Sequence, residues 1–192
     1  MAKNCIILHG CPSDKEKAMN PETRTYDKHW IPWAKKEIEK LGISVETPHM
    51  PEPWAASYSE WKNEFSKFLV GEDTILIGHS CGCAFLVRWL AETKRKIKSL
   101  ILVAPWKTPD DDFTGSRREF YLFDIDQGVA DQCGNITIFT SNDEEEQGKK
   151  DQALYHQVLG GKLIVLENHG HYTLGDMGTE EFPELIETVK KS

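Results

Sequence analysis

The sequence alternates six short apolar runs, most of them rich in β-branched residues, with longer amphipathic stretches. In chain order the runs are Cys5–Leu8, Ile43–Thr47, Thr74–Ile77, Leu100–Val103, Ile136–Thr140 and Leu163–Leu166. Continuous apolar runs of this length predict strands that are buried on both faces, as in a parallel sheet. Because such strands alternate with helices in right-handed βαβ units, we expect a doubly wound α/β sandwich.

Five stretches between and after these runs carry helical spacing or helix start signals. They are Trp30–Leu41, the segment that begins with Ser57-x-x-Glu60, Cys83–Ala91, Gly148–Leu159 and Glu181–Lys190. Pro32 near the start and Gly42 just past the end bound the first of these helices. Ser57 and Glu60 predict a capping box at the start of the second. The segment Cys83–Ala91 is almost wholly apolar, which predicts a deeply buried helix.

Three stretches do not fit the alternation of strands and helices. They are the polar segment Gly10–Lys28, the proline-rich segment Pro48–Trp54 and the long insertion Trp106–Cys133. Each follows the carboxyl end of a predicted strand, which is where ligands bind in open α/β sheets. We therefore expect Gly10–Lys28 and Trp106–Cys133 to shape a pocket.

Length and charge narrow the class of protein. The 192 residues suit one domain, 1–192, with a short insertion at about 106–133. The 31 acidic residues outnumber the 23 basic ones and give a net charge of −8, which argues against a nucleic-acid binder. The chain has no run of about 20 apolar residues, so we expect no membrane-spanning helix.

The cysteine pattern indicates a reducing environment. The five cysteines are Cys5, Cys11, Cys81, Cys83 and Cys133. An odd number cannot pair completely within one chain, and the chain has no Cys-x-x-Cys pair. We therefore expect a reduced, cytoplasmic protein.

The segment Gly78-His79-Ser80-Cys81-Gly82 is the sharpest chemical signal. It follows a predicted strand directly and leads into the apolar helix, which is the strand–turn–helix context of a nucleophile elbow. The turn is tight, so it needs small residues two positions before and two positions after the serine. Ser80 is thus the predicted nucleophile, and the alternative is a glycine-rich helix entry without chemistry.

A serine hydroxyl needs a base to remove its proton, and in this chain order the base follows the sixth strand. Two histidines, His169 and His171, follow Leu163–Leu166. We favour His171, because Gly170 relaxes the backbone turn before it and Tyr172 can pack behind its ring.

The base needs a carboxylate that holds its tautomer and stabilises the imidazolium. Two candidates, Asp143 and Glu144, follow the fifth strand. Asp143 sits where the strand ends and has the shorter side chain, while Glu144 is one residue further on. The choice between them stays open, and Glu145 and Glu146 are expected to be solvated.

An oxyanion hole requires two backbone N–H groups. We expect the first from Cys81, the residue after the nucleophile, and the second from Cys11 in the loop after the first strand. Just beyond the fourth strand, Trp106 is the candidate to line a substrate pocket.

The other histidines are assigned structural roles. His9 is expected to be a core or supporting residue, and the side chain of His79 is expected to point away from the serine hydroxyl. A metal site built from His9, His79, His169 and His171 lacks ligand spacing, so we expect no metal.

With these segments in place, the sequence resembles the small α/β-hydrolases of the retinoblastoma-binding protein 9 and YdeN type. The resemblance is carried by HWIPWAKKEIEKLG, Met50–Pro53, TILIGHSCG, SLILVAPW and Asn168–Tyr172. It implies a serine hydrolase active on small esters or peptide-like acyl compounds, with Ser80 as nucleophile and His171 as base. The acid segment departs from the family's Ser-x-Asp-Asp pattern: Glu144 takes the acid position by register and Asp143 by side-chain type. The sequence has no Leu-x-Cys-x-Glu motif, so binding to the retinoblastoma protein does not carry over.

We therefore expect a three-layer α/β-hydrolase-like sandwich with a six-stranded, mostly parallel sheet in the order 2-1-3-4-5-6. The predicted activity is cleavage of a small ester, thioester or amide through an acyl-serine intermediate, without a cofactor. The partner is a small acyl compound rather than nucleic acid or membrane, and the oligomeric state stays open. Because the strands and helices use most of the chain, we expect a minimal lid and a partly open site.

Two alternatives are also compatible with the sequence. One is a binding module on the hydrolase fold whose chemistry is lost or incidental, which an incomplete acid site would favour. The other is a dehydratase, lyase or haloperoxidase that uses the same three residues.

Overall fold

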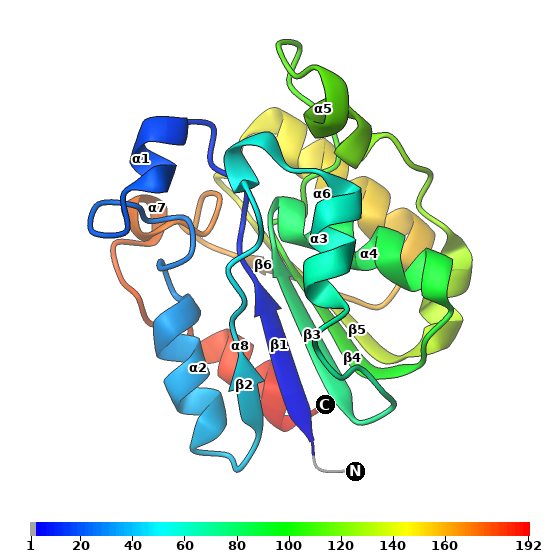
Figure 1. The fold of residues 1–192 in the computed structure, drawn as a ribbon. Helices are drawn as coiled ribbons and strands as arrows, with labels where there is room; N and C mark the ends of the chain where they lie inside the picture. The colour runs from blue at the N-terminus through cyan, green and yellow to red at the C-terminus, as the bar shows by residue number, and fades with distance from the viewer. Residues whose placement is uncertain (1–2) are drawn as a thin grey trace.

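A six-stranded parallel sheet forms the centre of the computed structural model, which describes residues 3–192 (Figure 1). The strands are β1 (Asn4–Leu8), β2 (Ser44–Glu46), β3 (Thr74–His79), β4 (Ile97–Val103), β5 (Cys133–Ser141) and β6 (Lys162–Leu166). They run in the order β2-β1-β3-β4-β5-β6, and every neighbouring pair is parallel. The predicted strands and their order are confirmed, and residues 1 and 2 of the predicted domain lie outside the described residues.

Helices cover both faces of the sheet and complete three layers. On one face lie α2 (Ile31–Glu39) and α8 (Pro183–Lys190), and on the other lie α3 (Tyr58–Phe65), α4 (Cys81–Thr93) and α6 (Glu146–Leu159) (Figure 1). These are the five predicted helices. The three stretches expected to be irregular contain or adjoin shorter elements, namely α1 (Lys15–Met19), η1 (Pro53–Ala55), α5 (Gly115–Tyr121) and η2 (Gln127–Gln132). A further short helix that the sequence did not predict, α7 (Leu174–Met177), lies between β6 and α8.

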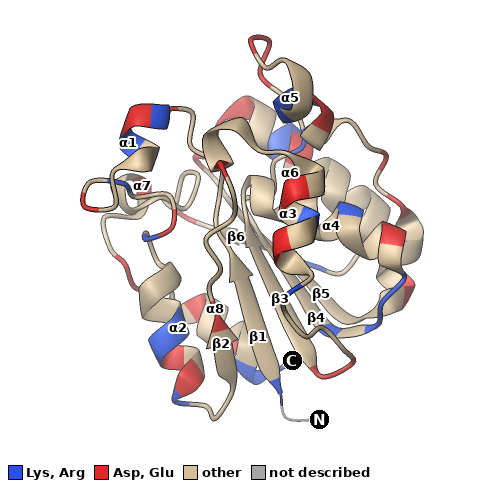
Figure 2. Cartoon of the chain, viewed as in Figure 1, with Lys and Arg blue, Asp and Glu red and all other residues tan. Residues whose placement is uncertain are grey.

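Alternation along the strands explains why continuous apolar runs are needed. In β1, Cys5 and Ile7 pack with α2 and α8, while Ile6 and Leu8 pack with α3 and α4. Successive side chains of a strand point to opposite faces, so a strand covered on both faces needs apolar residues at every position. Figure 2 shows the consequence, since charged residues lie on the helices and loops and the central strands carry almost none.

Two sequence expectations about local structure are wrong. β2 and β6 are edge strands and are not buried on both faces: Ser44 and Glu46 of β2 are exposed, and Leu163 and Val165 of β6 are exposed by 37% and 57%. Ile164 and Leu166 of β6 pack against the core, so one face of this strand is enough to hold it. The capping box also fails, because the Ser57 hydroxyl lies 3.1 Å from the Ser59 hydroxyl and makes no cap bond.

The loops at the carboxyl edge of the sheet bring distant parts of the chain together. The segment after β1, which contains α1, lies beside the segment after β6, which contains α7 (Figure 1). This edge is where the sequence places its candidate catalytic residues. Within residues 3–192, none of the helices combines the length and the apolar character needed to cross a membrane.

Candidate active site

A sharp turn between β3 and α4 presents Ser80. Its backbone has φ 53° and ψ −121°, a conformation that non-glycine residues rarely adopt and that commonly marks functional sites. A Cβ atom on Gly78 would lie 2.8 Å from the backbone N of Cys83, and one on Gly82 would lie 2.7 Å from the carbonyl O of His9. Both glycines are therefore sterically required, as the sequence predicts for a nucleophile elbow.

Ser80, His171 and Glu144 form a continuous hydrogen-bonded chain. Nε2 of His171 lies 2.9 Å from Oγ of Ser80, and Nδ1 of His171 lies 2.9 Å from Oε2 of Glu144. A carboxylate beside Nδ1 fixes the tautomer with hydrogen on Nδ1, which leaves Nε2 free to accept the serine proton. The structure thus brings together three of the residues proposed from the sequence.

The Glu144 carboxylate is held from several sides. Its side chain is only 1% exposed. The Gln152 side-chain amide donates to Oε2 at 2.8 Å, and the backbone N–H of Glu145 donates to Oε1 at 3.0 Å. The hydroxyl of Thr140 in turn donates to the Gln152 carbonyl oxygen. A Cβ on Gly148 of α6 would lie 2.7 Å from Cδ of Glu144, so this glycine makes room for the carboxylate.

Asp143 has a different role from its neighbour. Its carboxylate accepts hydrogen bonds from the Ser141 hydroxyl and from the backbone N–H of Gly170, the latter at 2.9 Å. These two donors lower the pKa of Asp143 below its usual value. Asp143 therefore holds the loop that carries His171, whereas Glu144 contacts the imidazole ring itself.

Two further residues hold the backbone of His171. Nε2 of His79 donates to the His171 carbonyl O at 2.8 Å, and a carboxylate oxygen of Asp176 accepts the His171 N–H at 3.1 Å. Burial, helped by nearby histidines, holds the pKa of His79 well below its ordinary value, so its ring is neutral. The sequence reasoning missed Asp176 and Gln152. The Thr173-x-x-Asp176 spacing, which forms a capping box on α7, was the one available signal.

The residues next to His171 in this loop agree only in part with the sequence expectations. Gly170 has φ 47°, as its predicted role in the turn requires. Tyr172, however, does not pack behind the His171 ring. Its hydroxyl donates to the carbonyl O of Thr140 at 2.7 Å, and its ring lies in the core against Phe139. His169, the other histidine considered as the base, bonds within its own turn: its Nδ1 lies 2.7 Å from the carbonyl O of Glu167.

The two expected oxyanion donors are covalently linked. Cys11 and Cys81 form a disulfide with a Cα–Cα distance of 5.7 Å, so the expectation of a fully reduced chain is wrong. The reason is the close approach of the loop after β1: a Cβ on Gly10 would lie 3.2 Å from Cβ of Ser80. Because Cys81 is the first residue of α4, its N–H has no acceptor within the helix.

His9 orients the start of this loop. Its Nδ1 donates to the carbonyl O of Gly10 at 2.8 Å, and its Nε2 accepts the N–H of Met50 at 2.9 Å. Burial lowers the pKa of His9 to about 4, so the ring is neutral and can serve as donor and acceptor at once. The expected supporting role of His9 agrees with this arrangement.

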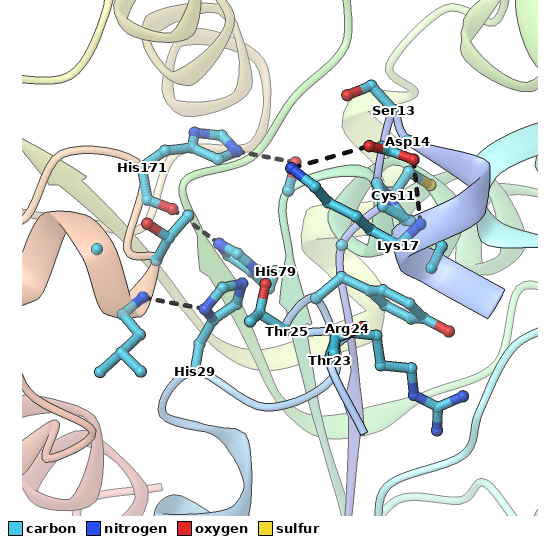
Figure 3. A pocket seen from close by; sticks show the side chains of 18 residues that line it. Cys11, Ser13, Asp14, Lys17, Thr23, Arg24, Thr25, His29, His79 and His171 are labelled. Carbon is cyan, nitrogen blue, oxygen red and sulfur yellow. Dashed lines mark hydrogen bonds and ion pairs between the residues drawn. The ribbon is translucent and has the colours of Figure 1, made fainter. Parts of the chain in front are cut away.

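A cavity of about 880 Å³ opens beside Ser80 and His171 (Figure 3). Its walls come mainly from the segment 10–29 and from residues 173–175. His29 lines it, and Nδ1 of His29 accepts the N–H of Leu174 at 2.9 Å and ties the two walls together. Burial lowers the pKa of His29 to about 4. Exposed residues at the rim, such as Ser13 and Lys17, leave the cavity open to solvent.

The expectation that Trp106 and the insertion 106–133 line this cavity is wrong. Neither Trp106 nor any other residue of that insertion is among those that line the cavity, and the indole N–H of Trp106 donates to the carbonyl O of Thr108 at 2.6 Å. Instead the indole packs nearly perpendicular to the His171 ring, with centroids 5.5 Å apart. Trp106 therefore shields the imidazole, and the segment 10–29 shapes the pocket.

Comparisons with known proteins identify a family of serine hydrolases. A family model described as serine hydrolase matches residues 23–191. The chain is 32% identical over 165 residues to serine hydrolase RBBP9 of Rattus norvegicus, with 84% of each chain covered. It is 25% identical over 202 residues to YdeN of Bacillus subtilis (strain 168), with 98% of this chain and 95% of YdeN covered.

Solved structures extend the similarity to the whole fold. The crystal structure of the B. subtilis ydeN gene product matches with a TM-score of 0.84 at 20% identity, covering 99% of this chain and 98% of that one. Est1E from Butyrivibrio proteoclasticus matches with a TM-score of 0.66 at 15% identity, covering 99% of this chain and 86% of that one. At these identities the matches show a shared fold.

Proposed function

Since the chain belongs to the serine hydrolase family and is an enzyme of the α/β-hydrolase fold, we propose that it cleaves a small ester, thioester or amide through an acyl-serine intermediate on Ser80. The observation that carries this proposal is the chain of hydrogen bonds from Ser80 through His171 to the buried Glu144. The described residues act as a single catalytic domain.

In the acylation step, Oγ of Ser80 attacks the carbonyl carbon of the substrate while Nε2 of His171 takes the hydroxyl proton. The imidazolium that forms carries its Nδ1–H toward Glu144, whose negative charge stabilises it. When the tetrahedral intermediate collapses, His171 returns the proton to the leaving alcohol, thiol or amine. The acyl group then remains on Ser80.

The developing oxyanion is stabilised by the backbone N–H groups of Cys81 and Cys11. The N-terminus of α4, a helix of 13 residues, points toward the same place and adds a favourable dipole. In the second half of the reaction, His171 takes a proton from water, and the resulting nucleophile attacks the acyl-serine. The acid product leaves, and Ser80 recovers its proton.

The open cavity supports a small substrate. Its volume of about 880 Å³ lies within the range of small-molecule sites. At the rim, Nζ of Lys17 lies 3.8 Å from Oδ2 of Asp14. Because these two groups have opposite charges, they favour neither a cationic nor an anionic substrate strongly. A small acyl compound is therefore the proposed partner.

The alternative of a catalytically inactive binding module depended on an incomplete acid site, and the buried contact of Glu144 with His171 argues against it. A cytoplasmic location remains part of the proposal. The three free thiols Cys5, Cys83 and Cys133 are compatible with a reducing compartment, and this location requires that the Cys11–Cys81 disulfide be a redox-active bond rather than a permanent one.

Hydrolysis of p-nitrophenyl esters of increasing acyl length tests the proposed function. We expect the wild type to hydrolyse the short-chain esters and Ser80→Ala to lose the activity by at least about 10³-fold. Ser116→Ala, which changes an exposed serine on α5, is the matched control and should retain activity. Equal rates for Ser80→Ala and wild type would overturn the proposal.

A further inference from the structure

We propose that the Cys11–Cys81 disulfide positions the oxyanion hole, and that hydrolysis by this enzyme therefore depends on the redox state of this one cysteine pair. The inference rests on the proposed function, because it concerns the two residues whose N–H groups are assigned to the oxyanion. It goes further by naming a covalent element that aligns them and a chemical condition that controls them.

The disulfide joins the two segments that must be aligned for catalysis. Cys81 follows Ser80 directly and begins α4, while Cys11 lies three residues after the end of β1. The bond connects residues separated by 70 positions in the sequence. A covalent link at this point sets the distance between the two backbone N–H groups within a narrow range.

The two ends of the bond differ in how firmly the rest of the protein holds them. Cys81 is fully buried and belongs to a helix packed into the core. Cys11, by contrast, lies in a half-buried loop. The residues on either side of it, Gly10 and Pro12, accept hydrogen bonds through their carbonyls, from His9 at 2.8 Å and from Arg117 at 3.5 Å. The chain then continues into the exposed residues that begin at Ser13. If the bond opens, Cys11 is the end that moves.

Opening the bond also forces a movement. Two sulfur atoms that are no longer bonded repel each other at bonding distance and must separate by more than about 1 Å. A misplacement of about 1 Å in a catalytic group can cost about 10²-fold in rate. Because the oxyanion contact strengthens in the transition state, the loss should appear in kcat more than in KM.

The sulfur of Cys11 is the accessible one. Cys11 is half-buried and lines the cavity beside Ser80, and Figure 3 shows its side chain at the wall of this cavity. The thiolate of a small dithiol can attack Sγ of Cys11, which breaks the disulfide and releases Cys81 as a thiolate that takes up a proton. The second thiolate of the reductant then displaces Cys11, which also takes up a proton. The dithiol leaves as a disulfide, so two electrons pass to the cysteine pair.

The test compares the oxidised and the reduced enzyme. The enzyme oxidised with glutathione disulfide and the enzyme reduced with dithiothreitol are separated from reagent, and kcat and KM are measured with a short-chain p-nitrophenyl ester. Alkylation after denaturation, followed by intact-mass spectrometry, counts the free thiols. We expect three in the oxidised form and five in the reduced form. We expect kcat to fall by about 10- to 100-fold on reduction, with KM changing less than about threefold.

Variants separate positioning from folding and from other thiols. Cys11→Ser should show the low kcat under both conditions and keep a cooperative thermal transition. Cys133→Ser removes a free thiol distant in sequence from the pair, and it should respond to reduction as the wild type does. Reoxidation of the reduced wild type should restore kcat.

Equal kcat in forms shown to have three and five free thiols would overturn the redox proposal and leave the proposed function standing. Five free thiols after oxidation would also overturn it. An enzyme inactive in both forms would overturn the proposed function together with the inference.

Discussion

The carboxylate of Glu144 lies 2.9 Å from Nδ1 of His171, although Asp143 precedes it in the chain and is also close to the histidine loop. The two acids at the end of β5 contact different parts of the histidine loop. Glu144 turns into the protein and contacts the imidazole, while Asp143 stays at the surface and binds the backbone of Gly170. The order of the acids along the chain therefore does not indicate which one orients the base.

Separate substitutions of the two acids should have unequal effects. Glu144→Gln removes the charge that stabilises the imidazolium and allows the wrong tautomer of His171. We expect kcat/KM to fall by about 10³- to 10⁴-fold. Asp143→Asn retains a side chain of the same size at the loop and should cost less than about tenfold. Ester hydrolysis by the two purified variants checks this, and a larger loss for Asp143→Asn would reverse the assignment.

Gly148 provides a test of the Glu144 position from a residue that touches no substrate. In Gly148→Ala the new Cβ overlaps the Glu144 side chain and must displace the carboxylate from His171. Alanine favours the helix by up to about 1 kcal/mol over glycine, so activity should fall by about 10- to 100-fold without a matching loss of helical structure.

Kinetics and circular dichroism of Gly148→Ala measure the two effects separately. Lys149→Ala, at the next and exposed position of α6, is the control and should keep full activity. Full activity in Gly148→Ala would mean that the carboxylate need not occupy its observed position.

His79 should act through the backbone of His171. His79→Ala removes the hydrogen bond to the His171 carbonyl, and we expect kcat to fall by about 10-fold or more while KM changes little. His79→Gln keeps an N–H donor and should recover part of the loss. Steady-state kinetics of both variants test this role, and equal losses in the alanine and glutamine variants would argue against it.

The strands of the sheet could be predicted because each one is indicated by a short apolar run in its own part of the sequence. Strands that are buried on both faces need apolar residues at successive positions, and the runs that form the central strands β1, β3 and β4 have this pattern. Ser80 was predictable for the same reason, since Gly78 and Gly82 lie within two residues of it and are needed for the turn. The edge strand β6 was misjudged because its apolar residues Leu163 and Val165 face solvent, which no local pattern reveals.

The supporting residues of the site were not predictable, because they depend on contacts between distant segments. The choice of Glu144 over Asp143 depends on Gln152 and on the space left by Gly148 in α6. The Cys11–Cys81 disulfide depends on how the loop after β1 folds back onto α4. The indole of Trp106 was expected in the pocket, but it donates to Thr108 and packs against His171.

Acid should destabilise the protein through its buried neutral histidines. The pKa of His9 is about 4 in the folded protein and about 6.5 in the unfolded chain, so the unfolded chain takes up the proton first as the pH falls. Above about pH 6.5 the ring is neutral in both states and contributes nothing to the pH dependence. Between about pH 6.5 and pH 5, His9 alone should lower the free energy of unfolding by about 2 kcal/mol.

Urea unfolding of wild type and His9→Gln at about pH 7 and pH 5 measures this contribution. The wild type should lose about 2 kcal/mol more than the variant on acidification, since glutamine does not titrate. The same pH dependence in both proteins would show that His9 does not resist protonation in the fold.

Labelling with a fluorophosphonate tests the central claim most directly, because the reagent reacts with a serine that a neighbouring base activates. Peptide mapping by mass spectrometry should find one adduct per chain, on Ser80. Labelling should be absent at that site in Ser80→Ala and slower by about 10²-fold or more in His171→Ala. An adduct on another residue, or a rate that does not depend on His171, would contradict the account.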